Sequence, residues 1–142
     1  MIKILFVCHG NICRSTMAEY VMKDLVKKAG LEHNFYITSA GTSTEELGNP
    51  VHHGTRKKLR EEGIYCGDHR AAQLQKSDLT DFDYLVAMDT ANLKNMHRML
   101  GDSPKISRLL DYTDLPRDIA DPWYTGNFDV TFTDISRGCR AL

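Results

Sequence analysis

The 142-residue chain has little of what marks secreted or membrane-bound proteins. Its four cysteines, at positions 8, 13, 66 and 139, show neither the paired spacing of a zinc site nor a secreted disulfide framework. The opening apolar run has six residues including Lys3, which is too short for the core of a signal peptide. No later run approaches the length of a membrane span. These absences predict a cytoplasmic protein with reduced thiols.

Charge of one sign is also lacking. The formal net charge is -1, with 26% charged and 42% hydrophobic residues. This balance is typical of a globular protein and indicates neither nucleic acid nor a membrane surface as a partner. The sequence has no repeat, low-complexity tract or linker, so we predict a single domain over residues 1–142.

What the sequence does contain is a short polar stretch, Cys8–Ser15, between an apolar run and a segment of helical periodicity. A strand that leads through a tight loop into a helix points loop amides at an anion. We therefore predict an oxyanion cradle with Cys8 as the nucleophile. The residues expected to bind the phosphate are His9, Gly10, Asn11, Ile12, Cys13 and Ser15.

The residue types in this loop suit displacement at phosphorus by sulfur. The Cys8 thiol should ionise readily, because helix-terminal amides and Arg14 favour a thiolate. The planar fork of Arg14 can hold two oxygens of a transferring phosphoryl group, and Ser15 can donate a hydrogen bond to Cys8. Gly10 relieves crowding in the turn, and Asn11 tolerates left-handed backbone angles. The loop lacks the lysine of a nucleotide P-loop.

Strand and helix patterns alternate along the chain and predict an α/β fold. Expected strands cover 2–7, 35–38, 84–88 and 105–109, and expected helices cover 16–29, 51–62 and 90–100, with a last helix from Thr133. The result would be a three-layer sandwich: a four-stranded parallel sheet with helices on both faces and the phosphate-binding loop between the first strand and the first helix. Cys8 would then lie at the carboxyl edge of the sheet, where such folds bind ligands.

Five motifs together resemble the low-molecular-weight protein tyrosine phosphatases, in that family's order and over nearly the whole chain. They are residues 7–15, Thr38–Thr42, Gly48–Pro50, Met88–Asp89 and Asp121–Tyr124. The resemblance implies hydrolysis of phosphotyrosine and small aryl phosphates through a phosphocysteine intermediate, without metal or cofactor. Expected partners are a phosphotyrosine-containing protein or peptide and inorganic phosphate or a similar oxyanion, and the protein is expected to be monomeric or weakly self-associating.

Asp121 is the expected general acid. The proline that follows stiffens its loop, while Trp123 and Tyr124 can wall an aromatic leaving group and partly desolvate the carboxyl. Asp118 matches no family position and is interpreted as a solvated loop charge. The adjacent His52 and His53 are expected to diverge on a helix and to face solvent.

The resemblance further implies that Asn11, Ser39 and His69 form a hydrogen-bonding network that holds the loop; the residues alone give no reason to choose Ser39 or His69. Cys8 and Cys13 are expected to form a reversible disulfide on oxidation, the alternative being that Cys13 only packs under the loop.

Three features depart from the family. Thr16 replaces the usual proline and is expected to loosen the loop. Glu45 occupies a position on the pocket wall that is often aromatic, and it is expected to weaken stacking on phosphotyrosine or to disfavour acidic peptides. The chain ends at Leu142, where the family's last helix usually continues, so that helix is expected to be truncated.

Three alternatives stay open. Arginine phosphatases share most of these motifs but typically carry threonine in place of Ile12, which favours phosphotyrosine here. An arsenate reductase needs two further redox cysteines close together, whereas Cys66 and Cys139 are far apart in sequence. A non-catalytic phosphate-binding module is disfavoured because nucleophile, arginine and acid are all retained.

Overall fold

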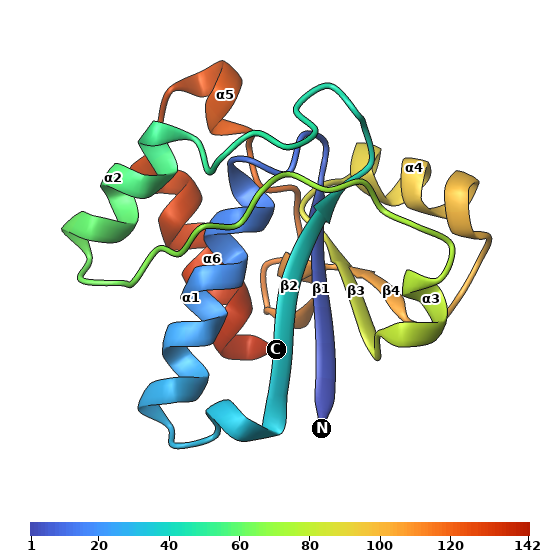
Figure 1. Cartoon of the computed structure of the whole chain (residues 1–142), viewed down its shortest axis with the longest axis horizontal. Coiled ribbons are helices and arrows are strands. Elements are labelled where there is room, and N and C mark those ends of the chain that lie inside the picture. The colour runs from blue at the N-terminus through green and yellow to red at the C-terminus, as the bar shows by residue number, and fades with distance from the viewer.

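Four parallel strands form the sheet at the centre of the computed structural model, which describes residues 1–142 (Figure 1). In the order β2-β1-β3-β4, they are Phe35–Gly41, Ile2–Cys8, Tyr84–Ala87 and Ile106–Arg108. Helices α1 (Arg14–Lys28) and α6 (Phe128–Ala141) cover one face of the sheet, and α4 (Thr90–Leu100) covers the other. The predicted three-layer α/β sandwich is confirmed.

Burial of β1 on both faces from Ile4 to Cys8 explains why this part of the strand is apolar throughout. Ile4 and Phe6 contribute to the larger core cluster, which α1 and α6 help to form, whereas Leu5 and Val7 contribute to the cluster beneath α4. Strand β1 pairs with β2 along its full length, from Ile2 opposite Phe35 to Cys8 opposite Gly41. Cys8 therefore lies at the carboxyl edge of the sheet, as predicted.

The remaining elements are short. They are α2 (His53–Glu61), α3 (Asp78–Asp81), α5 (Pro122–Thr125) and the 3₁₀ turns η1 (Glu32–Asn34) and η2 (Leu109–Tyr112). The four-residue helices and the turns are too short to show a helical period, which is why the sequence did not predict them. None of the helices has the length and apolar composition that crossing a bilayer requires.

Several helix boundaries differ from the expected ones; α2, for example, covers His53–Glu61 instead of 51–62. The first helix begins at Arg14 instead of position 16, so that arginine sits in the helix's first turn. The last helix begins at Phe128 instead of Thr133, because the side chain of Asn127 accepts a hydrogen bond from the Val130 N–H and caps the helix five residues earlier.

Gly41 ends β2 against the backbone of the Cys8–Ser15 loop. A Cβ atom there would lie 2.7 Å from the carbonyl oxygen of His9 and 3.1 Å from the Asn11 Cβ. Backbone cannot move aside as a flexible side chain can, so we expect Gly41→Ala to displace the loop. The variant should lose about 1–3 kcal/mol of unfolding free energy, measured by denaturant titration, together with most of the activity that depends on this loop.

Gly30→Ala is the matched control. Gly30 has a positive φ of 72° but no neighbouring atom that a Cβ would meet. Its substitution should cost about 1–2 kcal/mol through backbone strain alone and leave turnover unchanged. If Gly41→Ala and Gly30→Ala lost the same activity, a displacement of the Cys8–Ser15 loop by a Cβ at position 41 would be excluded as the cause.

Candidate active site

The Cys8–Ser15 loop directs backbone carbonyl groups toward the rest of the protein. The carbonyl oxygens of Cys8 and His9 accept hydrogen bonds from the N–H groups of Thr42, at 2.9 Å, and Ser43, at 3.0 Å. The N–H groups of residues 9–13, in contrast, donate to no backbone carbonyl. Since His9, Gly10, Ile12 and Cys13 line a pocket together with Cys8, the unengaged N–H groups form a cradle suited to an anion.

Asn11 holds the shape of this loop. Its φ is 60°, the one positive φ at a non-glycine residue, which confirms the expected left-handed conformation. The side-chain oxygen of Asn11 accepts hydrogen bonds from the Ala72 N–H at 3.0 Å and from His69 Nε2 at 2.7 Å, while its Nδ2 donates to Ser15 Oγ at 2.8 Å. Ser15 Oγ lies 3.0 Å from Cys8 Sγ, so its hydroxyl hydrogen is available to a thiolate.

A buried carboxylate closes the network that the family resemblance implies. Ser39 Oγ donates to Glu19 Oε1 at 2.6 Å and lies 3.3 Å from His69 Nε2, and His69 Nδ1 lies 3.4 Å from the same Glu19 oxygen. Asn11, Ser39 and His69 thus come together as expected, with Glu19 as an unexpected member. Glu19 is 1% exposed, yet in sequence it looks like any surface acid of a helix, so no signal could have identified it.

Arg14 is almost fully buried and tightly held. Its Nη1 donates to Asp89 Oδ2 at 2.6 Å and to the Ile119 carbonyl at 2.9 Å, and its Nη2 donates to Asp121 Oδ2 at 3.4 Å. Its Nε is buried and has no hydrogen-bond partner. Burial opposes the charged form, but Cys8 and Asp89 raise the pKa of Arg14 overall, so the guanidinium stays charged.

Asp89 is a site residue to which the sequence alone assigned no role. A usable signal existed: Asp89 directly follows the strand expected over 84–88 and lies two residues after the end of β3 at Ala87, which places it at the same sheet edge as Cys8. Its carboxylate both binds Arg14 and caps α4, since Asp89 Oδ1 accepts from the Asn92 N–H at 2.7 Å.

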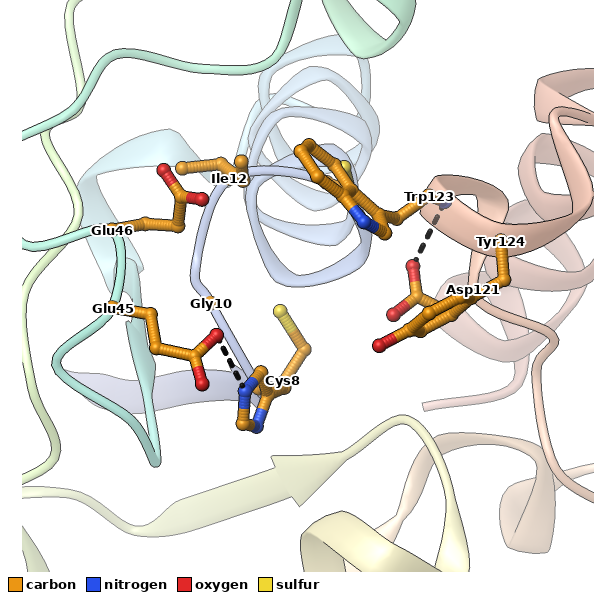
Figure 2. Close-up of a pocket in the computed structure, with 10 residues that line it drawn as sticks. Cys8, Gly10, Ile12, Glu45, Glu46, Asp121, Trp123 and Tyr124 are labelled. Carbon is orange, nitrogen blue, oxygen red and sulfur yellow. Dashed lines mark hydrogen bonds and ion pairs between the residues drawn. The ribbon is translucent and has the colours of Figure 1, made fainter.

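Asp121 lies across the pocket from the nucleophile (Figure 2). One carboxylate oxygen accepts from the Trp123 N–H at 3.0 Å, which caps α5, and the other accepts from Arg14. The side chain is 24% exposed. The Asp121 carboxyl therefore has two hydrogen-bond donors, the Trp123 N–H and Arg14 Nη2. The sequence suggested only that the neighbouring aromatic rings would partly desolvate this carboxyl.

The rim of the pocket has two unlike sides. On one side Glu45 forms an ion pair with His9, with 3.3 Å between Oε2 and Nε2, and Glu46, which the sequence did not suggest, lies beside it. On the other side are the largely exposed rings of Trp123 and Tyr124 (Figure 2). The three residues expected to wall the pocket, Glu45, Trp123 and Tyr124, all line it.

The prediction that the side chains of His52 and His53 diverge is wrong, whereas the expectation that they face solvent holds for the exposed His53 and only in part for the half-buried His52. Their rings stack with centroids 4.3 Å apart, and the His52 ring is 5.5 Å from the rings of both Trp123 and Phe128. The two side chains do not diverge because His52 is the N-cap of α2, with non-helical angles of φ -57° and ψ 141°. Burial lowers the pKa of His52, which favours the neutral ring.

The structure adds detail to two further expectations. Asp118 is exposed, as expected of a solvated loop charge, but its Oδ1 also accepts hydrogen bonds from Thr90 and Arg108. Thr16 Oγ1 donates to the Cys13 carbonyl at 2.9 Å, a bond that proline cannot make, and the expected loosening of the loop stays a prediction.

Cys13 is buried beneath the loop in a small cluster with Ile12 and Ala71. Burial, reinforced by the nearby Cys8, raises the pKa of the Cys13 thiol to about 12, so Cys13 stays protonated at neutral pH. The two cysteines of the loop therefore differ in their surroundings: Cys13 is held protonated in an apolar cluster, whereas Cys8 Sγ contacts the Ser15 hydroxyl.

A parallel α/β sheet that presents a thiol, a buried arginine and unengaged amides at its carboxyl edge is the arrangement of the cysteine-dependent phosphatases. Comparison with known proteins narrows this class. The sequence model described as low molecular weight phosphotyrosine protein phosphatase matches residues 3–142. The chain belongs to that family, whose members are hydrolases of phosphotyrosine.

Relatives cover the chain from end to end. The low molecular weight protein-tyrosine-phosphatase YfkJ of Bacillus subtilis is 47% identical over 147 aligned positions, which cover 100% of this chain and 94% of that protein. The YfkJ crystal structure superposes with a TM-score of 0.95, covering 99% of this chain and 91% of that one at 46% identity. A mouse low molecular weight phosphotyrosine protein phosphatase is 38% identical over 98% of this chain and 92% of its own.

A structural relative of different specificity also matches. The crystal structure of a Drosophila arginine phosphatase superposes with a TM-score of 0.89, at 31% identity over 99% of this chain and 94% of that chain. The fold alone therefore does not separate the two substrate classes.

The two loop cysteines should react differently with an alkylating agent. At neutral pH we expect iodoacetate to label Cys8, which lines the pocket beside the Ser15 hydroxyl, and to spare Cys13, whose raised pKa keeps its thiol protonated. Peptide mass spectrometry after brief labelling measures this. Inorganic phosphate should protect Cys8, and Cys8→Ser should take no rapid label. Labelling of Cys13 ahead of Cys8 would contradict the assignment of the nucleophile.

Proposed function

We propose that the protein hydrolyses phosphotyrosine in proteins or peptides, and small aryl phosphates, with Cys8 as nucleophile, Arg14 as transition-state stabiliser and Asp121 as general acid and base. The observation that carries this assignment is the buried guanidinium of Arg14. Three of its five N–H groups are used by the protein, and Nε has no partner although it is buried. A tetrahedral oxyanion above Cys8 would supply acceptors for the remaining donors.

In the first step, the Cys8 thiolate attacks phosphorus in line with the tyrosyl oxygen. The P–O bond breaks, Asp121 gives its proton to the departing oxygen, and a phosphocysteine remains. Ser15 stabilises the thiolate, because its hydroxyl lies 3.0 Å from Cys8 Sγ. The amides of His9 to Cys13 and the guanidinium of Arg14 stabilise the charge that develops on the equatorial oxygens.

In the second step, the Asp121 carboxylate takes a proton from water as that water attacks phosphorus. The S–P bond breaks, inorganic phosphate forms, and the Cys8 thiolate is restored. Asn11, Ser39 and His69 contribute by holding the loop, through the contacts that link Asn11 to Ser15. Neither step uses a metal or a cofactor.

Several broader properties belong to the same proposal. Residues 1–142 act as one phosphatase domain, which is supported by a site assembled from one sheet and its flanking segments. The four free cysteines are consistent with a cytoplasmic location. The protein works as a monomer or in weak self-association, without nucleic acid or membrane. A peroxide oxidises the Cys8 thiol to a sulfenic acid with release of water, and the Cys13 thiol then displaces a second water to form a reversible disulfide, which is supported by the place of both residues in one pocket.

Kinetics on a phosphotyrosine peptide test the proposal. Cys8→Ser should be inactive. Asp121→Asn keeps an oxygen for the Trp123 N–H cap but cannot donate the proton, so kcat/KM should fall on the order of 10²–10⁴. Wild-type activity in the presence of a chelator is the reference. Full activity of Cys8→Ser would refute the mechanism.

Phosphoarginine is the matched alternative substrate in the same assay. Ile12 lines the pocket and favours phosphotyrosine, because arginine phosphatases typically carry threonine at this position. A strong preference for phosphoarginine would leave the nucleophile and the fold intact but overturn the substrate. Hydrolysis of neither compound would favour the phosphate-binding module.

Glu45 should influence which peptides are hydrolysed. Its carboxylate stands at the pocket mouth beside Glu46 and should repel acidic residues next to the phosphotyrosine. Glu45→Gln should raise kcat/KM for acidic-flanked peptides by up to about fivefold, as expected for an exposed charge pair, with little change for a neutral peptide. Glu32→Gln, in η1 far from the pocket, is the control. Equal effects on both peptides would rule out selection by charge.

A further inference from the structure

The segment that carries Asp121 has no regular structure of its own. Between the end of η2 at Tyr112 and the start of α5 at Pro122, no residue belongs to a helix or strand. A proton donor on an irregular segment is placed accurately only where other contacts fix the backbone near it. The contacts around Asp118 and Ile119 are therefore the ones to consider.

Asp118 concentrates three hydrogen bonds on one carboxylate oxygen. Its Oδ1 accepts from the Thr90 N–H at 2.9 Å, from Thr90 Oγ1 at 2.9 Å and from Arg108 Nη1 at 2.8 Å. Arg108 is itself held by Asp111, through Nε at 3.0 Å and Nη2 at 2.7 Å. Asp118 is thus bound to the first residue of α4 and to the last residue of β4, both regular elements.

Thr90, to which Asp118 is bound, lies close to Arg14, the arginine proposed to bind phosphate. Thr90 follows Asp89, whose carboxylate binds Arg14 at 2.6 Å. The residue after Asp118 is tied to the same region, since the Ile119 N–H donates to the Met88 carbonyl at 3.0 Å and its carbonyl accepts from Arg14. The acid-bearing segment is therefore aligned with the turn after β3, which also orients the guanidinium.

The charge of Asp118 persists over the working pH range. Partial burial alone would raise its pKa, but the hydrogen bonds from Arg108 and Thr90 outweigh burial and lower it. The Asp118 side chain is 49% exposed, so the ion pair contributes little to the stability of the fold. The three hydrogen bonds to Asp118 therefore fix the position of the acid-bearing segment more than they contribute to the free energy of unfolding.

We propose that Asp118 is a positioning residue for the general acid: through Thr90 and Arg108 it sets the distance of Asp121 from the leaving-group oxygen. The inference rests on the proposed role of Asp121. It also defines which substrates need Asp118, because a leaving group that departs poorly requires protonation and a good leaving group does not.

The test compares phenyl phosphate, whose phenoxide leaves poorly, with 4-nitrophenyl phosphate, whose phenoxide leaves well. Asp118→Ala should lower kcat/KM about tenfold or more for phenyl phosphate and less than about threefold for 4-nitrophenyl phosphate. Asp118→Asn retains an acceptor for Thr90 and should show a smaller loss with the same pattern. Thermal unfolding should show both variants folded.

Asp102→Ala is the matched control, because it removes an exposed ion pair with His97 at the other end of α4 and touches neither Arg108 nor the acid-bearing segment. It should change kcat/KM for neither substrate. Asp121→Asn is the reference and should show the leaving-group pattern most strongly. Losses by Asp118→Ala that are equal for the two substrates, or no loss at all, would overturn the positioning role. A missing pattern in Asp121→Asn would instead refute the general acid itself.

Discussion

The buried guanidinium of Arg14 determines how the site is put together. Removing a charged side chain from water costs several kcal/mol unless hydrogen-bonding partners replace the solvent. Here the partners come from two separate places: Asp89 from the end of β3, and Ile119 and Asp121 from the segment before α5. Burial of one arginine therefore brings the sheet edge, the phosphate loop and the acid-bearing segment together, and these are the parts that phosphate-ester chemistry needs.

The phosphate loop depends on a second constraint, which is its unfavourable backbone shape. A left-handed residue costs roughly 1–2 kcal/mol unless it is glycine. Asn11 adopts this conformation, and its side chain is held at three points, by Ala72, His69 and Ser15. The same contacts that compensate the strain also place the Ser15 hydroxyl beside Cys8. The same hydrogen bonds of Asn11 thus fix the geometry of the loop and position the group that activates the nucleophile.

Local pattern explains which parts of this structure the sequence predicted. The strands, the long helices and the Cys8–Ser15 loop could be predicted because each is a property of neighbouring residues. Asp89 was within reach, since it follows a strand. The buried role of Glu19 and the three-donor environment of Asp118 were not, because Ser39 lies 20 residues from Glu19, and Thr90 and Arg108 lie 28 and 10 residues from Asp118, so that only the folded chain brings them together. His52 was misread because its role as a cap depends on where α2 begins.

Different parts of the molecule determine the choice of substrate and carry out the chemistry. Cys8, Arg14 and Asp121 are bound into buried or half-buried networks that connect the loop, the sheet edge and the acid-bearing segment. Glu45 and His9 are exposed and pair with each other at the rim, with side chains 72% and 47% accessible. Because nothing buried depends on this ion pair, the rim can vary in charge while the catalytic groups keep their geometry. A fold shared by tyrosine and arginine phosphatases is what such a separation permits, since specificity then rests on a few residues around an unchanged phosphate loop.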